Sequence, residues 1–308
     1  MKIGIFSHIV LDSIRDTEGF ETESLGGPSC YGNVIAKTFG FNVVLFTKIG
    51  LDLDNKKLAY LNQNSIHIKP DQIDDKNPTT RFRLIMHRDG GRDLFLLSKC
   101  SPINLAFLDT DGLDGIVLSP VIDEISNDIF QILHQTKEKD RFIMLDPQGF
   151  LRYRDKDTSL ISLKKQLDVD IKAITAIKAD ENELSVLTNG VIGIEGMKLL
   201  RKKYNLDFVV STSNNQISLL HKKTVYTLDL KQRPNIDSTG LGDILTTGFT
   251  CSYLKEKDPL WGLCFGVGSV IGALDSKTRG LEKVPRKINI IERHASYCYN
   301  TVKFKIIE

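Results

Sequence analysis

The sequence predicts an α/β protein whose mostly parallel central sheet is covered by helices on both faces, and two patterns lead to this prediction. Short apolar runs rich in Val and Ile alternate with stretches whose apolar residues recur at helical spacing. The alternation continues over most of the 308 residues, which favours strand–helix–strand units with buried parallel strands. No repeat, low-complexity tract or linker interrupts it, so we expect a single domain over 1–308.

The N-terminal part is expected to mix strands and helices. The predicted strands lie at 2–9, 43–47 and 65–69, and the predicted helices at 28–39 and 53–62. Pro28 suits the first turn of its helix, because its missing N–H group would be unpaired there anyway. The segments 80–87 and 92–97 alternate around Arg88-Asp89-Gly90-Gly91, which is typical of a β-hairpin.

Beyond this hairpin, strands and helices are expected in turn. The predicted strands lie at 115–119, 141–145, 173–177 and 207–211, with an antiparallel pair at 216–221 and 224–228. The predicted helices lie at 122–134, 159–166, 181–187, 193–204, 242–255, 259–274 and 286–299.

Composition argues against several classes of protein. Lys and Arg total 41 and Asp and Glu 39, so a net charge of +2 gives no electrostatic footprint for nucleic acid or an anionic membrane. No apolar run approaches the roughly 20 residues of a membrane-spanning helix, and residues 1–6 lack the shape of a signal peptide. The five cysteines are scattered and never form C-x-x-C, which disfavours a disulfide framework or a zinc site. We therefore expect a protein of the reducing cytoplasm.

The most informative stretch is residues 237–243 (DSTGLGD), which precede an apolar run at helical spacing. Gly240 and Gly242 flank a single residue, so the backbone can turn tightly and bring its N–H groups close to a ligand. At a helix N-terminus, free N–H groups and the positive end of the helix dipole attract an anion. Asp243 would lie beside that anion. The loop and the carboxylate together suit phosphoryl transfer to a hydroxyl group.

Other interpretations of this loop exist. It could be an ordinary Gly-rich turn in which Asp243 only stabilises the helix dipole. The chain contains no G-x-x-x-x-G-K-[ST], which excludes a P-loop. Gly240 and Gly242 lack the third glycine of G-x-G-x-x-G and lie late in the chain, so a nicotinamide-binding loop is a weak interpretation.

Two separated motifs resemble the ribokinase-like (PfkB) carbohydrate kinases. DSTGLGD is similar to the D-T-x-G-A-G-D loop of that family and also lies near the C-terminal fifth. Residues 25–27, 36–40 and 43–52 resemble the family's G-G … A-x-x-L-G-x-x-V-x-L-x-x-x-V-G-x-D. The resemblance implies a three-layer α/β/α fold with a small β-sheet lid, formed by about 12–25 and 78–98, that covers the sugar and often pairs with a second subunit.

The resemblance also implies roles for the loop. Asp243 would be the general base that deprotonates the acceptor hydroxyl. The N–H groups of Leu241, Gly242 and Asp243 would form the anion hole, with Gly240 completing the loop and both glycines contacting the nucleotide phosphates. Asp237 corresponds to an Asp that helps to hold a monovalent cation (K⁺) and the shape of the loop. Its alternative role is to cap a turn through its side chain.

Residues 180–183 (DENE) resemble the family's N-x-x-E motif, whose Glu organises magnesium and phosphate through water. Asp180 takes the Asn position and Glu183 matches the Glu, so ATP and Mg²⁺ are the implied cofactors. The alternative is an acid-rich helix N-terminus.

Acceptor-binding positions of the family fall on Asp12, Gly26 and Gly27. A carboxylate can accept two substrate hydroxyls, and glycines let a polyol approach the backbone. Tyr31 stands where the family commonly has Asn, which alters the usual contact with the sugar ring and puts ribokinase or fructokinase specificity in doubt.

Residues 146–152 (DPQGFLR) resemble the family's D-x-N-x-R, with Gln148 in place of Asn. Arg152 is expected to pair with a phosphate, or else to be a solvated residue at a helix start. Together with 26–31 and 98–103, this segment looks most similar to the archaeal branch that includes myo-inositol 3-kinases.

The sequence contains only weak signals for a nucleotide-binding site. Residues 211–216 (STSNNQ) occupy the place of the family's T-x-G-x-x-G turn and lack both glycines, although Ser211 and Ser213 can hydrogen-bond phosphate or ribose. Gly268 is a candidate for lining the adenine pocket, where helix–helix packing is the simpler account of a small residue.

The expected activity is therefore ATP- and Mg²⁺-dependent phosphorylation of a hydroxyl group of a sugar or a cyclic polyol such as myo-inositol. We expect a homodimer paired through the lid, with neither nucleic acid nor membrane as a partner. A nucleoside kinase of the same family is one alternative. A catalytically silent sugar- or nucleotide-binding protein on this fold is another.

Overall fold

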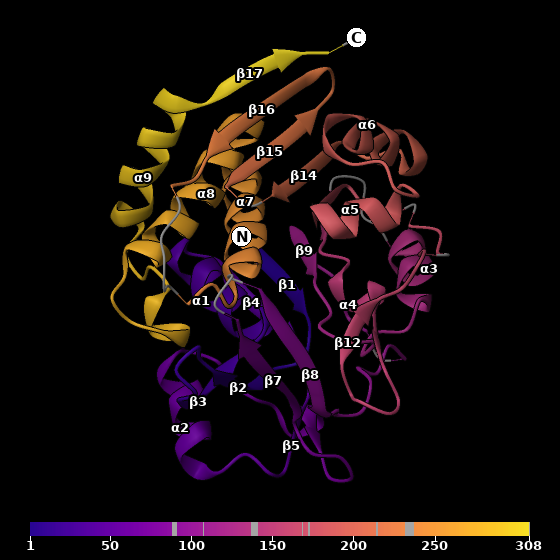
Figure 1. Cartoon of the computed structure of the whole chain (residues 1–308), viewed down its shortest axis with the longest axis vertical. Coiled ribbons are helices and arrows are strands. Elements are labelled where there is room, and N and C mark those ends of the chain that lie inside the picture. The colour runs from indigo at the N-terminus through magenta and orange to yellow at the C-terminus, as the bar shows by residue number, and fades with distance from the viewer. Residues whose placement is uncertain are drawn as a thin grey trace.

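A long mixed sheet runs through the middle of the molecule (Figure 1). The computed structural model describes residues 1–87, 91–106, 108–136, 141–167, 169–171, 173–213, 215–231 and 237–307. Within these residues the strand order is β17-β16-β15-β14-β13-β10-β9-β1-β4. The parallel strands are β1 (Lys2–Phe6), β4 (Asn42–Phe46), β9 (Gly115–Leu118), β10 (Phe142–Leu145), β13 (Ala176–Asp180) and β14 (Phe208–Ser213). Antiparallel strands β15 (Gln216–His221), β16 (Thr224–Asp229) and β17 (Lys303–Ile306) extend one edge.

Helices cover both faces of this sheet, because successive side chains of its strands point to opposite sides. Ile3 and Ile5 of β1 belong to one apolar cluster, and Phe6 belongs to another. The first cluster includes residues of α1 (Pro28–Thr38), α2 (Asn55–Gln63), α7 (Leu241–Glu256), α8 (Pro259–Asp275) and α9 (Ile288–Thr301). The second includes residues of α3 (Asp128–Gln135), α5 (Glu181–Leu187) and α6 (Gly193–Tyr204). The predicted three-layer arrangement is confirmed.

A second, smaller sheet lies in the lower half of Figure 1, away from the C-terminus. Its strand order is β3 (Glu21–Gly26), β2 (Val10–Arg15), β7 (Thr80–Met86) and β8 (Arg92–Ser98). The predicted hairpin corresponds to β7 and β8, which are antiparallel, while the turn residues Arg88–Gly90 lie outside the described residues. A third apolar cluster, including Phe82 and Leu84, joins this sheet to the loop after β9.

Shorter elements complete the fold. They are the helix α4 (Gln148–Leu151), the paired strands β5 (Ile49–Gly50) and β6 (Ile73–Asp74), the paired strands β11 (Arg152–Arg154) and β12 (Ile161–Leu163), and the 3₁₀ helices η1 (Pro70–Gln72) and η2 (Gly280–Lys283). Of the helices in the described part of the chain, none combines the length and apolar character that crossing a membrane requires.

Two predicted helices differ from the structure. The segment 159–166 is not a helix, because β12 pairs with β11 across a turn in which the Asp155 carboxylate accepts from the N–H groups of Asp157 and Thr158. The helix predicted from 122 begins only at Asp128. The residues before Asp128 form a loop, because the Glu124 carboxylate accepts from the N–H groups of Val121 and Ile122.

One predicted strand is absent, and one strand was not predicted. Residues 65–69, all of them described, form no strand, because Ser65 has a left-handed φ of 57° and the N–H of Ile66 bonds back to the helix carbonyl of Leu61. The strand β17 was not predicted. Its register on β16, with Phe304 opposite Tyr226, depends on a distant strand that local pattern does not reveal.

Removing the Glu124 carboxylate is expected to destabilise the protein. The side chain is fully buried and also accepts from the N–H of His8, so Glu124→Ala leaves donors unpaired and lowers the free energy of unfolding by about 3 kcal/mol. Urea denaturation measures this loss. Asp123→Asn is the control, because Asp123 is largely exposed and Asn tolerates its φ of 48°. Equal stability of the two variants would contradict the structural role of Glu124.

Candidate active site

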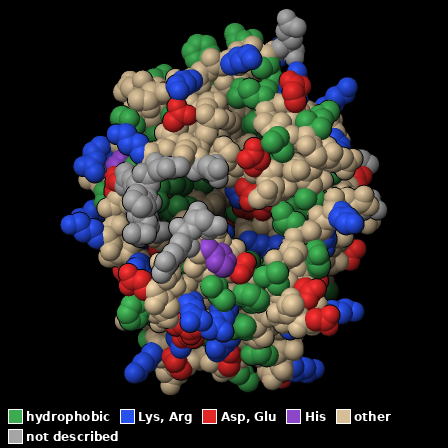
Figure 2. All heavy atoms as spheres, in the orientation of Figure 1, with side chains coloured by type: hydrophobic (Ala, Val, Ile, Leu, Met, Phe, Trp, Pro, Cys, Tyr) green, Lys and Arg blue, Asp and Glu red, His purple; other side chains and the backbone are tan. Residues whose placement is uncertain are grey.

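Two adjoining cavities open between the carboxyl ends of the parallel strands and the small sheet. The smaller has a volume of about 90 Å³ and the larger about 260 Å³. Arg92, Gln148, Arg152, Gly240 and Asp243 line both, so these residues mark the junction. Figure 2 shows the face hollowed near its centre, with acidic and basic side chains at the margin of the hollow. In doubly wound sheets, ligands bind at this edge.

The loop before α7 has the conformation that its glycines predict. Gly240 is the residue before the helix and has a φ of 75°, which favours glycine. A Cβ atom there would lie 2.4 Å from the Tyr31 ring. The helical ladder starts with the N–H of Ile244, which donates to the Gly240 carbonyl, while the Leu241 N–H makes a long 3.4 Å bond to Ser238. By helix geometry, the N–H groups of Gly242 and Asp243 are therefore the donors left for a ligand.

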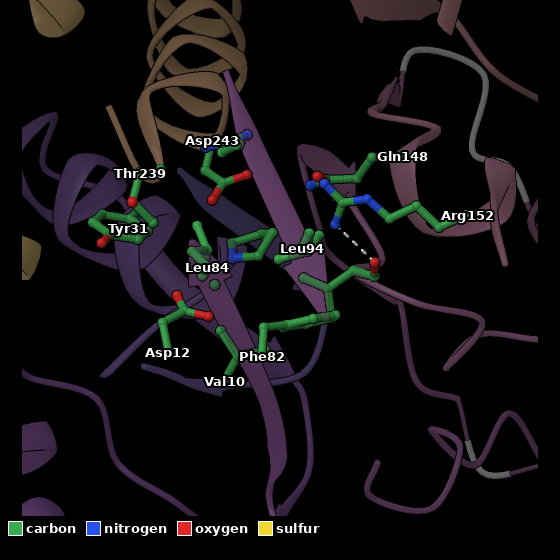
Figure 3. Close-up of a pocket in the computed structure, with 15 residues that line it drawn as sticks. Val10, Asp12, Tyr31, Phe82, Leu84, Leu94, Gln148, Arg152, Thr239 and Asp243 are labelled. Carbon is green, nitrogen blue, oxygen red and sulfur yellow. Dashed lines mark hydrogen bonds between the residues drawn. The ribbon is translucent and has the colours of Figure 1, made fainter. Parts of the chain in front are cut away.

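Asp243 lies at the junction of the cavities and is 8% exposed. Figure 3 shows its carboxylate pointing into the space between α7 and the small sheet. Burial raises the pKa of Asp243 to about 7. The Asp146 charge adds to this rise, whereas the charges of Lys178 and Arg152 oppose it. A carboxylate with a pKa near neutrality is a better proton acceptor than an ordinary Asp.

Lys178 is a residue of the larger cavity that the sequence analysis missed. Its Nζ lies 3.1 Å from Asp146 Oδ2 and 3.7 Å from Glu183 Oε2, with side chains that are almost fully buried. Burial opposes the charge of Lys178, but Asp146 and Glu183 outweigh it and raise its pKa. A Cβ atom on Gly242 would lie 3.3 Å from this Nζ. A buried positive charge thus lies beside Gly242 of the DSTGLGD loop.

The predicted acceptor residues surround the smaller cavity. Asp12, Gly27 and Tyr31 line it, and Gly26 lies beside them, because a Cβ on Gly26 would be 3.1 Å from Asp12 Oδ2. Gly27 has a φ of 84°, and a Cβ there would be 2.8 Å from the His8 carbonyl oxygen. Burial raises the pKa of Asp12 to about 7.

The opposite wall carries the residues of the D-x-N-x-R-like segment. Gln148 and Arg152 both line the cavities, and Arg152 Nη1 donates to the Val121 carbonyl at 3.0 Å, as the dashed line in Figure 3 marks. Arg92, from β8 of the small sheet, was not among the predicted residues and adds a second guanidinium to both cavities.

An apolar wall in the smaller cavity was also missed. Leu84 of β7 and Leu94 of β8 face each other as a cross-strand pair, and both line the cavity. Phe82 and Val10 extend the same wall. Figure 3 shows Leu84 between Asp12 and Asp243. The cavity therefore has one polar and one apolar side.

Asp180 and Glu183 form a capping box at the start of α5. The Asp180 carboxylate accepts from the Glu183 N–H, and the Glu183 carboxylate accepts from the Asp180 N–H, both at 2.8 Å. Both residues also line the larger cavity. Among the described residues, no group of three or more His, Cys, Asp or Glu side chains converges on a metal site.

Asp237 bonds within the protein and does not line either cavity. Its Oδ1 accepts from the Thr239 N–H at 3.0 Å, and its Oδ2 accepts from the Gly280 N–H at 2.9 Å. Burial acts to raise the pKa of Asp237, but Lys283, 2.9 Å away, together with these N–H groups lowers it. The side chain shapes the loop, which agrees with the turn-capping role.

The predicted nucleotide-binding residues are only partly at the cavities. Ser213 lines the larger cavity, beside Thr212, whereas Ser211 is one position deeper in β14 and is not among the lining residues. Gly268 packs against α9, since a Cβ there would lie 2.8 Å from the Ala295 nitrogen. Helix packing thus accounts for Gly268.

Comparison with known proteins gives matches by structure alone. No protein-family model and no curated protein matches the chain by sequence. A pyrophosphate-dependent ribokinase-family kinase complexed with a pyrophosphate analogue and myo-inositol superposes with a TM-score of 0.76 at 19% identity, over 94% of this chain and 99% of that one. Ribokinase of Arabidopsis thaliana complexed with ribose and ATP gives 0.72 at 15% identity, over 95% and 98%.

A further similar structure concerns specificity. In a pyrophosphate-dependent myo-inositol-1 kinase, replacement of two residues by leucine gives a myo-inositol-3 kinase. The structure of this kinase superposes with a TM-score of 0.77 at 19% identity, over 96% of this chain and 99% of that one. These likenesses span nearly all of both chains. The protein therefore has the ribokinase-like fold, as its two motifs predict.

Proposed function

We propose that this protein is a ribokinase-family phosphotransferase that phosphorylates a hydroxyl group of a sugar or cyclic polyol by direct in-line transfer. One observation carries the proposal: the buried Asp243 carboxylate lies where the two cavities meet, next to the bare N-terminus of α7. An acceptor in the smaller cavity and a phosphate donor in the larger one would meet at this carboxylate.

The groups at the junction divide the chemistry among them. Asp243 takes the proton of the attacking hydroxyl, because its raised pKa matches neutral pH. The N–H groups of Gly242 and Asp243 receive the charge that develops on the transferred phosphoryl group. Lys178 and Arg152 add positive charge on the donor side. Mg²⁺ would neutralise donor phosphate charge, with Asp180 and Glu183 as the acids of the larger cavity that act on it through water.

ATP is the donor that we propose, as in the ribokinase neighbour. Pyrophosphate is a second candidate, favoured by two observations on the donor side. The turn at 211–216 lacks the glycines that bring a nucleotide phosphate to the backbone, and three cationic side chains line the larger cavity, Arg92, Arg152 and Lys178. Two of the similar structures described above are pyrophosphate-dependent.

The small sheet would act as the lid, because it supplies Asp12, Arg92 and the Leu84–Leu94 wall to the acceptor cavity. Closure of such a lid excludes water from the transfer. Pairing of two subunits through this sheet and a cytoplasmic location stay predictions. So does the alternative of a silent binding protein.

Asp243→Asn is expected to lower kcat by about 10²–10⁴-fold, because an amide of the same shape cannot accept the proton. Product release is measured with myo-inositol, ribose, fructose, 2-keto-3-deoxygluconate and cytidine, each with ATP and with pyrophosphate. Glu195→Gln is the control, since Glu195 is an exposed acid in the first turn of another helix. Unchanged turnover in folded Asp243→Asn would refute the base. No turnover of the wild type with any pair, despite tight binding, would favour the silent binder.

The pH profile of kcat/KM should show an acidic limb near pH 7. Asp243 must be deprotonated to act, and its pKa is about 7, so activity rises with pH through this value. Lys178→Met should move the limb to higher pH, because it removes a positive charge that lowers the pKa of Asp243. Lys202→Met, at an exposed lysine of α6, should leave the limb in place. A limb near pH 4 in the wild type would contradict this assignment.

The Leu84–Leu94 wall is expected to select which hydroxyl group faces Asp243. Leucines offer no hydrogen bond, so they favour the C–H face of a ring and leave its hydroxyls to the polar side. Leu94→Ser, alone and with Leu84→Asn, should change the phosphorylated position or raise the acceptor KM, as read by NMR of the product. Leu97→Ser is the control on the same strand, since Leu97 is 52% exposed. An unchanged product and KM would show that the wall does not orient the acceptor.

A further inference from the structure

A buried lysine binds the first residue of the DSTGLGD loop. Lys283, the last residue of η2, has a side chain that is 1% exposed, and its Nζ lies 2.9 Å from Asp237 Oδ2. The same Nζ donates to the Asp237 backbone carbonyl at 2.7 Å. The Tyr31 ring lies beside it, with its centroid 5.7 Å from Nζ. The ammonium is thus enclosed by a carboxylate, a carbonyl and an aromatic face.

These oxygen atoms are the kind that would ligate a small cation. Carboxylate and backbone carbonyl oxygens are the preferred ligands of hard metal ions. Asp237 is also the residue for which the family resemblance implies a monovalent cation. In this protein the ammonium of Lys283 already occupies that carboxylate and that carbonyl. A second positive charge within a few ångströms in a buried place would be strongly repelled. The residues therefore do not fit a bound K⁺.

We propose that Lys283 is a built-in counter-ion that replaces the monovalent cation, so the protein works without one. Lys283 acts as a positioning residue. It fixes Asp237, whose other carboxylate oxygen accepts from Thr239, and Thr239 precedes Gly240 at the start of the anion hole. The Tyr31 ring covers both Lys283 and Gly240, which ties the ammonium to the loop backbone. The effect on rate rests on the proposed kinase activity, whereas the effect on loop stability does not.

The test compares the full-length wild type with Lys283→Met in KCl and in tetramethylammonium chloride at equal ionic strength. Wild-type turnover and Tm should be the same in both salts. Lys283→Met should lose at least tenfold in kcat in tetramethylammonium and regain most of it in KCl, since K⁺ can then enter between the Asp237 oxygens. Its Tm should rise on adding KCl, because a ligand that binds only the folded state stabilises it.

Two further variants serve as controls. Lys277→Met removes an exposed lysine of the same segment and should behave as the wild type in both salts. Asp237→Asn removes the carboxylate and should show no rescue by KCl. A wild type that needs K⁺ for turnover or for its Tm would overturn the proposal, and so would Lys283→Met with unchanged kcat and Tm in tetramethylammonium. If no variant and no wild type turns over any substrate, the kinase proposal fails, while the Tm comparison still decides the role of Lys283.

Discussion

The arrangement of the whole site depends on one buried carboxylate, Asp243, in the first turn of α7. The N–H groups at the start of α7 would be satisfied by water if they lay on the surface. Here Tyr31 packs on Gly240 and the small sheet covers the opposite side, so the donors and Asp243 face a cavity instead of bulk solvent. Burial is also the largest cause of the raised pKa of Asp243. The same exclusion of water thus leaves the N-terminus of α7 facing a cavity and raises the pKa of the Asp243 carboxylate.

Two buried lysines around this loop each lie close to acidic side chains. Lys178 offsets Asp146 and Glu183 below the loop, and Lys283 offsets Asp237 at its start. A buried pair of this kind contributes little net stability, because desolvation offsets most of the attraction. Its value lies in geometry: Lys283 binds Asp237 at the start of the DSTGLGD loop, and Lys178 lies beside Gly242 near its end. The capping box of Asp180 and Glu183 likewise has two roles, because it begins α5 and also lines the larger cavity.

Some elements of this fold can be predicted from local sequence, and others cannot. The bounds predicted for α5 and α6 match the structure, because the caps and periodicity that define these helices lie within a few residues of each other. The predicted helix at 159–166 failed because that segment forms a hairpin whose turn depends on Asp155. The late start of α3 depends on Glu124 bonding to His8, which is 116 positions away. Contacts over such separations leave no periodic trace.

The sequence by itself determined the parallel sheet, the helix that follows DSTGLGD and the chemical type of Asp243, because propensity, glycine backbone freedom and side-chain chemistry are local properties. Only the tertiary structure decided which charges surround that carboxylate. Lys178, Arg152 and Asp12 come from three different elements, and the Leu84–Leu94 wall exists only through the pairing of β7 with β8. Electrostatic effects at a buried site depend on distance in space, and the folded chain alone sets that distance.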